Sequence, residues 1–185
     1  SRGLGDVYKR QDIYDDETKN IIIQGNEGYL KAKNFMKILM PKSVKKIKKY
    51  RDRQPLFIKE KIEEKLNEIY DTQVKLKSGG YLVINPTEAL VSIDINSGKS
   101  IKQKNVESTA LDTNLEAADE IARQIKIRDL SGLIIIDFID MMNFGNRKQV
   151  EKKLKEKCRK DRARVQIGRI SSFGLLEMSR QRLRE

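Results

Sequence analysis

Two apolar, β-branched runs, each carrying an aspartate, constrain the fold of this chain most strongly. The first is Ala89-Leu90-Val91-Ser92-Ile93-Asp94-Ile95-Asn96, and the second is Leu133-Ile134-Ile135-Ile136-Asp137-Phe138. Valine and isoleucine favour strands, whereas aspartate is depleted in strands and is rarely buried without a partner. An uncompensated buried carboxylate costs free energy, so two such aspartates call for a cation. We therefore expect two strands that bring acidic side chains to a positive ion.

The patterning around these runs alternates between strands and helices. Strands are expected at residues 20–23, 44–50, 81–85, 89–96, 133–139, 164–170 and 175–180. Helices are expected at residues 26–40, 58–69, 108–128 and 147–162, with Pro41 ending the first of them. This order predicts an α/β fold with a mixed sheet and flanking helices, and the glycine pair Gly79-Gly80 is the expected boundary between two units.

The charge balance favours a polyanionic partner. The 185 residues carry a formal net charge of +12, which points to nucleic acid first and to an anionic membrane surface second. The alternative is a general compositional bias, since the chain is rich in isoleucine and lysine throughout. No apolar run is long enough to span a bilayer, and no signal peptide is recognisable.

The counts of cysteine and histidine limit the catalytic groups and metal ligands that this chain can supply. The single cysteine, Cys158, excludes an internal disulfide and fits a reducing, cytoplasmic setting. Its place in a helical apolar row favours a core residue over a ligand or nucleophile. The chain has no histidine, so imidazole acid–base catalysis and histidine-ligated zinc are excluded within these residues. Any phosphodiester cleavage by this chain must then use carboxylates with a hard metal ion, or groups supplied by another chain.

The two-residue period of a strand selects the candidate metal ligands. Asp94 and Asn96 share one face, whereas Asp137 and Asp140 face opposite ways if both lie on a strand, so only one of them can meet Asp94. We choose Asp137 because it follows the longest apolar run. Two carboxylates plus water suit Mg²⁺, with Mn²⁺ as a substitute. The alternative is that both aspartates are strand-end caps or ion-pair partners of nearby Lys and Arg.

Several longer motifs resemble the catalytic region of the ribonuclease E/G family. The resemblance is dense from Ser78 onward and covers roughly residues 12–185. Its motifs are Ser78-Gly79-Gly80, Thr87-Glu88-Ala89-Leu90, Ile93-Asp94-Ile95-Asn96-Ser97-Gly98, Thr113-Asn114-Leu115-Glu116-Ala117-Ala118-Asp119-Glu120-Ile121-Ala122-Arg123-Gln124, Gly132-Leu133-Ile134-Ile135-Ile136-Asp137-Phe138-Ile139-Asp140-Met141, Asp161-Arg162-Ala163-Arg164 and Phe173-Gly174-Leu175-Leu176-Glu177-Met178-Ser179-Arg180-Gln181-Arg182.

The resemblance implies an endoribonuclease that cuts single-stranded RNA and leaves 5′-phosphate and 3′-hydroxyl ends. The Mg²⁺ carboxylates of the family fall on Asp94 and Asp137, and its supporting amide falls on Asn96. Candidate RNA contacts are Lys99, Lys102, Arg164, Arg169, Phe173 and Arg180, although for any single basic residue among them a solvated charge is the favoured interpretation. Arg164 matches a family position near the pocket for the RNA 5′ end, and Phe173 is favoured as a core residue but could stack on a base.

The resemblance also implies a domain organisation. Residues 1–11 are expected to be a non-native or disordered leader, 12–77 a partial RNase H-like subdomain, and 78–185 a DNase I-like catalytic subdomain. The S1 domain and the 5′-end sensor of the family would lie upstream, and the intact parent is expected to be a homo-oligomer. The rival functions are a non-catalytic RNA-binding or scaffold module of the same fold, and a DNase or another phosphodiesterase with a similar metal site.

Overall fold

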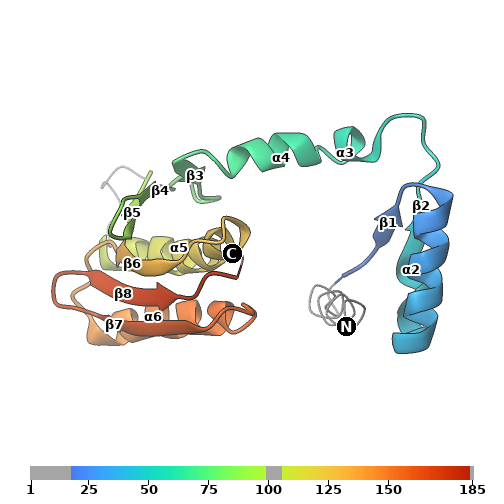
Figure 1. Cartoon of the computed structure of the whole chain (residues 1–185). Helices are drawn as coiled ribbons and strands as arrows, with labels where there is room; N and C mark the ends of the chain where they lie inside the picture. Colours follow the sequence, from blue (N-terminus) through green and yellow to red (C-terminus); the bar gives the residue numbers. More distant parts are fainter. Residues whose placement is uncertain (1–17, 99–105, 184–185) are drawn as a thin grey trace. The chain divides into compact units, whose positions relative to one another are not determined.

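The computed structural model of the chain describes residues 18–98 and 106–183, which form two compact units (Figure 1). The units are Ser1–Leu66 and Asn67–Glu185. The division precedes the glycine pair at which we expected it, because a short strand before that pair belongs to the same sheet as the strands after it. No helix in the described ranges is long and apolar enough to cross a membrane.

The first unit is built around a short parallel strand pair. Strand β1 (Ile21–Ile23) pairs with β2 (Ile47–Lys49), and helix α2 (Asn26–Leu39) with the 3₁₀ turn η1 (Pro41–Lys46) connects them. The helix expected at 26–40 is confirmed, and it ends at Leu39, two residues before Pro41. The single helix expected at 58–69 is instead two short ones, α3 (Leu56–Lys59) and α4 (Ile62–Glu68). They are separated at Lys61, whose φ of 52° is incompatible with a continuous helix.

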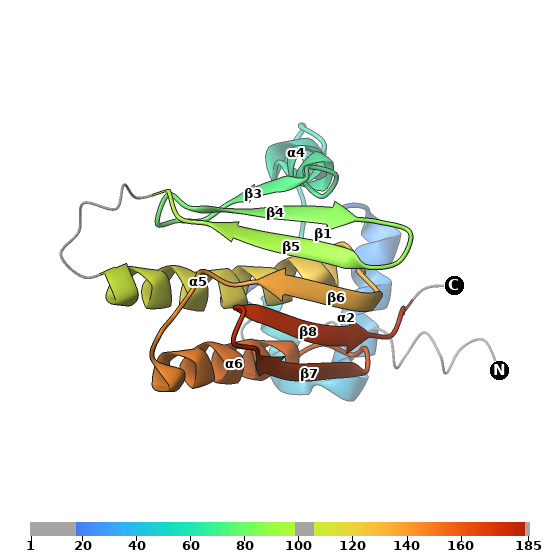
Figure 2. The ribbon, with the colours of Figure 1, turned by 90° about the vertical axis from the view of Figure 1, so that its left-hand side faces the viewer.

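The second unit contains a six-stranded mixed sheet in the order β3-β4-β5-β6-β8-β7. Its strands are β3 (Gln73–Lys75), β4 (Tyr81–Pro86), β5 (Val91–Asn96), β6 (Gly132–Asp137), β7 (Val165–Ile170) and β8 (Leu175–Arg180). Only the neighbours β5 and β6 run parallel, because helix α5 (Val106–Ile127) connects them as a crossover. Helix α6 (Phe144–Cys158) lies beside the β7–β8 hairpin (Figure 2). The predicted α/β class with a mixed sheet and flanking helices is confirmed.

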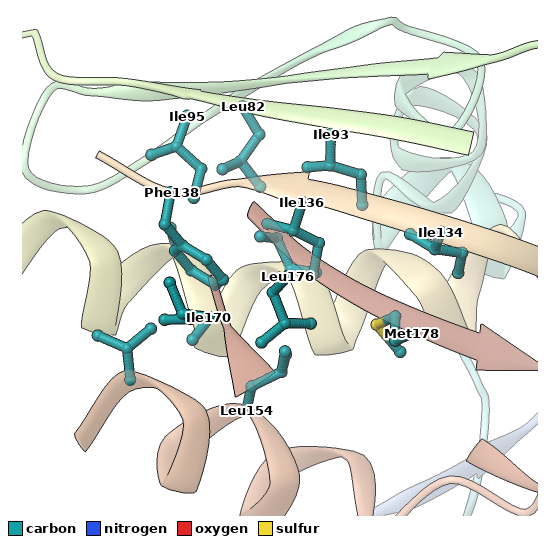
Figure 3. Packing of buried hydrophobic residues seen from close by; sticks show 14 of the residues in the cluster. Leu82, Ile93, Ile95, Ile134, Ile136, Phe138, Leu154, Ile170, Leu176 and Met178 are labelled. Carbon is teal, nitrogen blue, oxygen red and sulfur yellow. The ribbon is translucent and has the colours of Figure 1, made fainter. Parts of the chain in front are cut away.

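The core of this unit lies between one face of the sheet and helices α5 and α6. Ile93, Ile136 and Leu176 from three neighbouring strands belong to one buried cluster with Leu154 of α6, and all four are at most 1% exposed (Figure 3). Cys158 is buried in the same cluster, which confirms it as a core residue. Burial raises the pKa of its thiol to about 11, so the thiol is protonated at neutral pH.

Residues alternate along β5 as its sequence predicts. Val91, Ile93 and Ile95 are buried in the core, whereas Asp94 is exposed and Asn96 half-exposed on the opposite face. The same alternation along β6 buries Ile134 and Ile136 and exposes Asp137. The face turned away from the helices therefore carries the acidic side chains.

Candidate metal and catalytic site

Asp94 and Asp137 are direct neighbours across two parallel strands. The register of β5 and β6 pairs their Cα atoms, and each residue lies at or near the carboxyl end of its strand. Side chains paired in register on one face of a sheet project side by side. The Nδ2 atom of Asn96 donates a hydrogen bond to Asp94 Oδ2 at 2.8 Å. The three predicted residues thus come together at the carboxyl ends of the central strands β5 and β6, where open α/β folds bind ligands. We call this end of the sheet, with Asp94, Asp137 and the nearby Asp140, the acidic edge.

Negative charge is crowded at this edge. The pKa of Asp137 is raised above its ordinary value, by partial burial first and then by the negative charges of Asp94 and Asp140. An uncompensated group of carboxylates is therefore unfavourable here, and a bound cation would relieve the repulsion.

Asp140 lies close to Asp137, in a segment beyond the strand to which the face argument applies. A methyl group on Gly174 would lie 3.0 Å from Asp140 Oδ1 and 3.9 Å from Asp137 Oδ1, so both oxygens approach one point. The strand condition behind the prediction fails because β6 ends at Asp137 and the chain then leaves the sheet. Alternation does not apply beyond the end of a strand.

The segment that carries Asp137 and Asp140 is held by residues that the sequence reasoning missed. The buried amide of Asn114 on α5 bonds both the N–H and the C=O of Ile139, and Phe138 N donates to Gly174 O at 3.2 Å. Further along, Glu107 accepts hydrogen bonds from the N–H groups of Met142 and Asn143. One signal for Asn114 was available, since it lies four residues after Ala110 and three before Ala117, in an otherwise apolar row of α5.

Two glycines, Gly80 and Gly98, allow a close backbone approach beside Asn96. A Cβ on Gly98 would lie 1.8 Å from Gly79 O, and one on Gly80 would lie 2.6 Å from Asn96 O. The turn that contains Gly79 and Gly80 is tied to α5, because Glu116 Oε1 accepts from Lys77 N at 2.5 Å. The chain leaving β5 is therefore packed against a fixed turn, which restricts the backbone of Asn96.

The donor set fits a hard divalent cation. Asp94 and Asp137 offer carboxylate oxygens on an exposed face, which Mg²⁺ and Mn²⁺ prefer over nitrogen or sulfur ligands. Within residues 18–98 and 106–183, no group of three or more acidic or cysteine side chains is arranged to hold a metal ion. A site with two protein carboxylates leaves the remaining positions to water and substrate, which is usual for Mg²⁺.

The predicted RNA contacts are spread over the unit. Lys99 and Lys102 lie outside the described residues. Arg164 precedes β7 at the end of the sheet remote from Asp137, since Val165 pairs with Arg180 whereas Asp137 pairs with Leu175. Arg169 is exposed near the other end of β7. The structure therefore brings Arg169 towards the acidic edge and leaves Arg164 away from it.

Phe173 and Arg180 differ from expectation in opposite ways. Phe173 is 81% exposed in the turn between β7 and β8, so its favoured assignment to the core is wrong. It precedes Gly174, the residue beside Asp137 and Asp140. The side chain of Arg180 is fully buried and bonds Asp161, Asp129 and the carbonyl of Leu130. This position contradicts the predicted RNA contact of Arg180, because its guanidinium is occupied within the protein.

Comparison with known proteins assigns the family. The family model of the "Ribonuclease E/G family" matches residues 7–183. Ribonuclease E of Haemophilus influenzae is 48% identical over 95% of this chain and 18% of its own length. Ribonuclease E and ribonuclease G of Escherichia coli are 49% and 38% identical over 95% of this chain, which spans 16% and 36% of their lengths. This chain therefore belongs to the ribonuclease E/G family.

Proposed function

We propose that this chain supplies the catalytic centre of an endoribonuclease that hydrolyses single-stranded RNA and leaves 5′-phosphate and 3′-hydroxyl ends. The observation that carries the proposal is the register of Asp94 with Asp137, with Asn96 bonded to the first. Relatives named ribonuclease E and ribonuclease G, similar over 95% of the chain, support RNA as the substrate.

Asp94 and Asp137 would hold one Mg²⁺, with Mn²⁺ as a substitute. Such an ion, when bound, activates a water, polarises a phosphate and offsets the charge that develops in the transition state. Asn96 fixes the rotamer of Asp94 through its hydrogen bond, so that one carboxylate is oriented before RNA arrives. Asp140 adds a third negative charge beside Asp137, which strengthens the attraction for a cation.

The RNA itself is held by charge and stacking. A net charge of +12 attracts the backbone, and the exposed ring of Phe173 offers a stacking surface for an unpaired base close to the carboxylates. Lys99 and Lys102 stay predicted contacts, as does Arg164. A cytoplasmic setting, a homo-oligomeric parent and upstream S1 and 5′-sensor domains belong to the same proposal.

The deciding experiment replaces Asp94 with asparagine in the full-length protein. We expect the rate of Mg²⁺-dependent cleavage of a single-stranded RNA to fall about 100-fold or more, because a neutral amide replaces one of the two carboxylates that would bind the ion. Asp112→Asn, an exposed aspartate on α5, is the matched control and should leave the rate unchanged. Near wild-type cleavage by Asp94→Asn would end the assignment.

Two further measurements separate the rival functions. A non-catalytic RNA-binding module would bind RNA equally well with or without EDTA and would show no Mg²⁺-dependent cleavage. A general phosphodiesterase would be inhibited equally by RNA and DNA oligomers of one sequence. We expect cleavage that requires a divalent ion and that RNA inhibits more strongly than DNA.

A further inference from the structure

A basic groove runs between helix α6 and the edge strand β7. Its volume is about 720 Å³, and most of its lining side chains are charged. The cations that line it are Lys148, Lys152, Lys155, Arg159 and Arg169. Phe144, at the start of α6, also lines the groove, and Figure 2 shows α6 lying beside β7.

The groove is positive although two carboxylates line it. Glu151 Oε1 accepts a hydrogen bond from Ile170 N at 2.8 Å, so this carboxylate ties α6 to β7. Glu156 is the second acidic lining residue, and the five cations outnumber both. All five cations are exposed and available to a ligand.

The cations of α6 are spaced regularly. Lys148, Lys152, Lys155 and Arg159 follow at intervals of four, three and four residues, which places them about 4.5–6 Å apart along the helix axis. The row therefore extends about 16 Å on one side of the helix. A regular row of point charges suits a polymer with regularly repeated negative charges better than it suits a single small anion.

Contacts within the unit connect this groove to the acidic edge. Arg147 Nη1 donates to Ser171 O at 3.5 Å, and its guanidinium lies 6.0 Å from the ring centre of Phe144. Ser171 begins the turn that contains Phe173 and ends at Gly174, beside Asp137 and Asp140. The exposed rings of Phe173 and Phe144 thus lie on the route from the carboxylates to the groove.

We propose that the α6–β7 groove binds the phosphate backbone of the RNA that flanks the cleaved bond. This inference rests on the proposed ribonuclease function and adds the path of the bound RNA. The RNA passes over the turn at Phe173 and continues along α6. The repeated cations bind phosphates, and Phe144, with Lys148 Nζ 4.6 Å from its ring centre, stacks on a base at the start of α6. An acidic protein or an anionic membrane would be a different partner.

The experiment neutralises three groove lysines at once in the full-length protein. The variant carries Lys148→Gln, Lys152→Gln and Lys155→Gln, and glutamine preserves the helix propensity of these exposed positions. The control carries Lys75→Gln, Lys77→Gln and Lys126→Gln, three exposed lysines beside β3 and α5 with the same total charge change. The probe is a 20-nucleotide single-stranded RNA, and its dissociation constant is measured in EDTA at several salt concentrations.

We expect the groove variant to bind RNA at least about tenfold more weakly at low salt, with its salt slope reduced by about 2 for three lost phosphate contacts. The control should keep the wild-type slope. Equal losses in both variants would overturn the proposal, because they would show that only the diffuse charge matters. Unchanged RNA binding with loss of binding to anionic vesicles or to an acidic protein would also overturn it.

A second readout separates this inference from the proposed function. Asp94→Asn should abolish cleavage and keep the wild-type salt slope, so failure of the metal assignment leaves the groove result standing. The groove variant should lose cleavage efficiency, measured as kcat/KM, on the 20-nucleotide RNA but keep wild-type efficiency on a five-nucleotide RNA that cannot reach the groove. An equal loss on both lengths would contradict a flanking role and would indicate damage to the catalytic centre.

Discussion

The side chain of Asn114 makes two hydrogen bonds to the backbone of Ile139. Its Nδ2 donates to Ile139 O at 2.8 Å, and its Oδ1 accepts from Ile139 N at 3.0 Å. Asn114 is fully buried on α5, and Ile139 lies between Asp137 and Asp140. The amide therefore fixes the backbone segment that carries both carboxylates after β6 has ended.

Replacing Asn114 with leucine, which has a similar volume, should both destabilise the protein and slow cleavage. Two backbone groups of Ile139 would lose their partner, at a cost of about 1–3 kcal/mol in the free energy of unfolding. The displaced segment should lower kcat more than it weakens RNA binding, measured in EDTA. Thr113→Val is the control, because the buried Thr113 hydroxyl donates to Thr109 O within α5 rather than to the segment after β6. A leucine variant with wild-type kcat would show that Asn114 has no positioning role.

Gly174 offers a sharper test of the acidic edge. Gly174 has a φ of 78°, and a Cβ there would lie 3.0 Å from both Asp140 Oδ1 and Phe138 O. Gly174→Ala should therefore add a displacement of these groups to the usual strain of about 1–2 kcal/mol for a left-handed residue.

Gly132→Ala is the matched control for that substitution. Its φ is 84°, but an added Cβ would meet nothing within 4 Å. In urea unfolding both variants should lose about 1–2 kcal/mol from the left-handed φ, and Gly174→Ala somewhat more because of the added contacts, whereas only Gly174→Ala should lose most of its cleavage rate. Equal cleavage rates in the two variants would show that displacing Asp137 and Asp140 from Gly174 does not affect catalysis.

The two-residue period of a β-strand correctly predicted that Asp94 and Asp137 lie together on one face of the sheet. Alternation along β5 and β6 places Asp94 and Asp137 on one face, and a crossover helix makes the two strands parallel neighbours. These constraints are local and rigid, so a sequence can reveal them. The opposite orientation of Asp137 and Asp140, expected if both lie on a strand, does not apply, because β6 ends at Asp137 and contacts of Asn114 and Gly174 hold the segment that follows.

Arg180 shows a signal that was present but unused. Along β8, Leu176, Met178 and Arg180 share the buried face, so alternation alone places the guanidinium inside. Its partners Asp129 and Asp161 lie on separate loops, which no local pattern connects. The exposure of Phe173 and the break at Lys61 likewise depend on contacts and backbone conformations without a local sequence signature.

Breaking the buried ion pairs of Arg180 should strongly destabilise the second unit, because it leaves a buried charge without its partner. Arg180→Met leaves Asp161, whose side chain is 6% exposed, without its partner and should cost about 3–5 kcal/mol in unfolding free energy. Lys157→Met removes the partner of Asp119, which is 49% exposed, and should cost less than about 1 kcal/mol. Urea unfolding measures both. Similar losses in the two variants would show that burial does not strengthen the Arg180 pairs.

The same pair should make stability depend on acid pH. Burial acts to raise the pKa of Asp161, but hydrogen bonds from Arg180 and Ala163 outweigh it and hold the pKa below its ordinary value. The carboxylate therefore stabilises the fold above its unfolded pKa of about 3.9, and this stabilisation is lost as pH falls through the folded value. Unfolding free energies at pH 3, 5 and 7 should fall less steeply towards acid in Asp161→Asn than in the wild type. An equal pH slope would contradict this role.

Asp137 should have the opposite effect on stability when no divalent ion is present. Burial and the charges of Asp94 and Asp140 raise its folded pKa, so its ionised form destabilises the fold at neutral pH, and the penalty fades as pH falls through the folded value. In EDTA at pH 7, Asp137→Asn should therefore raise Tm, by on the order of 2 °C.

In the presence of Mg²⁺, the wild type should be more stable than Asp137→Asn, the reverse of the order in EDTA. An ion that binds only the folded state at 100 times its dissociation constant adds about 2.7 kcal/mol, and Asp137→Asn should lose most of this gain. Thermal unfolding in EDTA and in MgCl₂, at matched ionic strength, measures the difference. Asp140→Asn is the control, because it relieves part of the repulsion on Asp137 but leaves both proposed ligands in place, so it should keep most of the response to Mg²⁺. An Mg²⁺-dependent rise in Tm as large in Asp137→Asn as in the wild type would mean that the ion is held elsewhere.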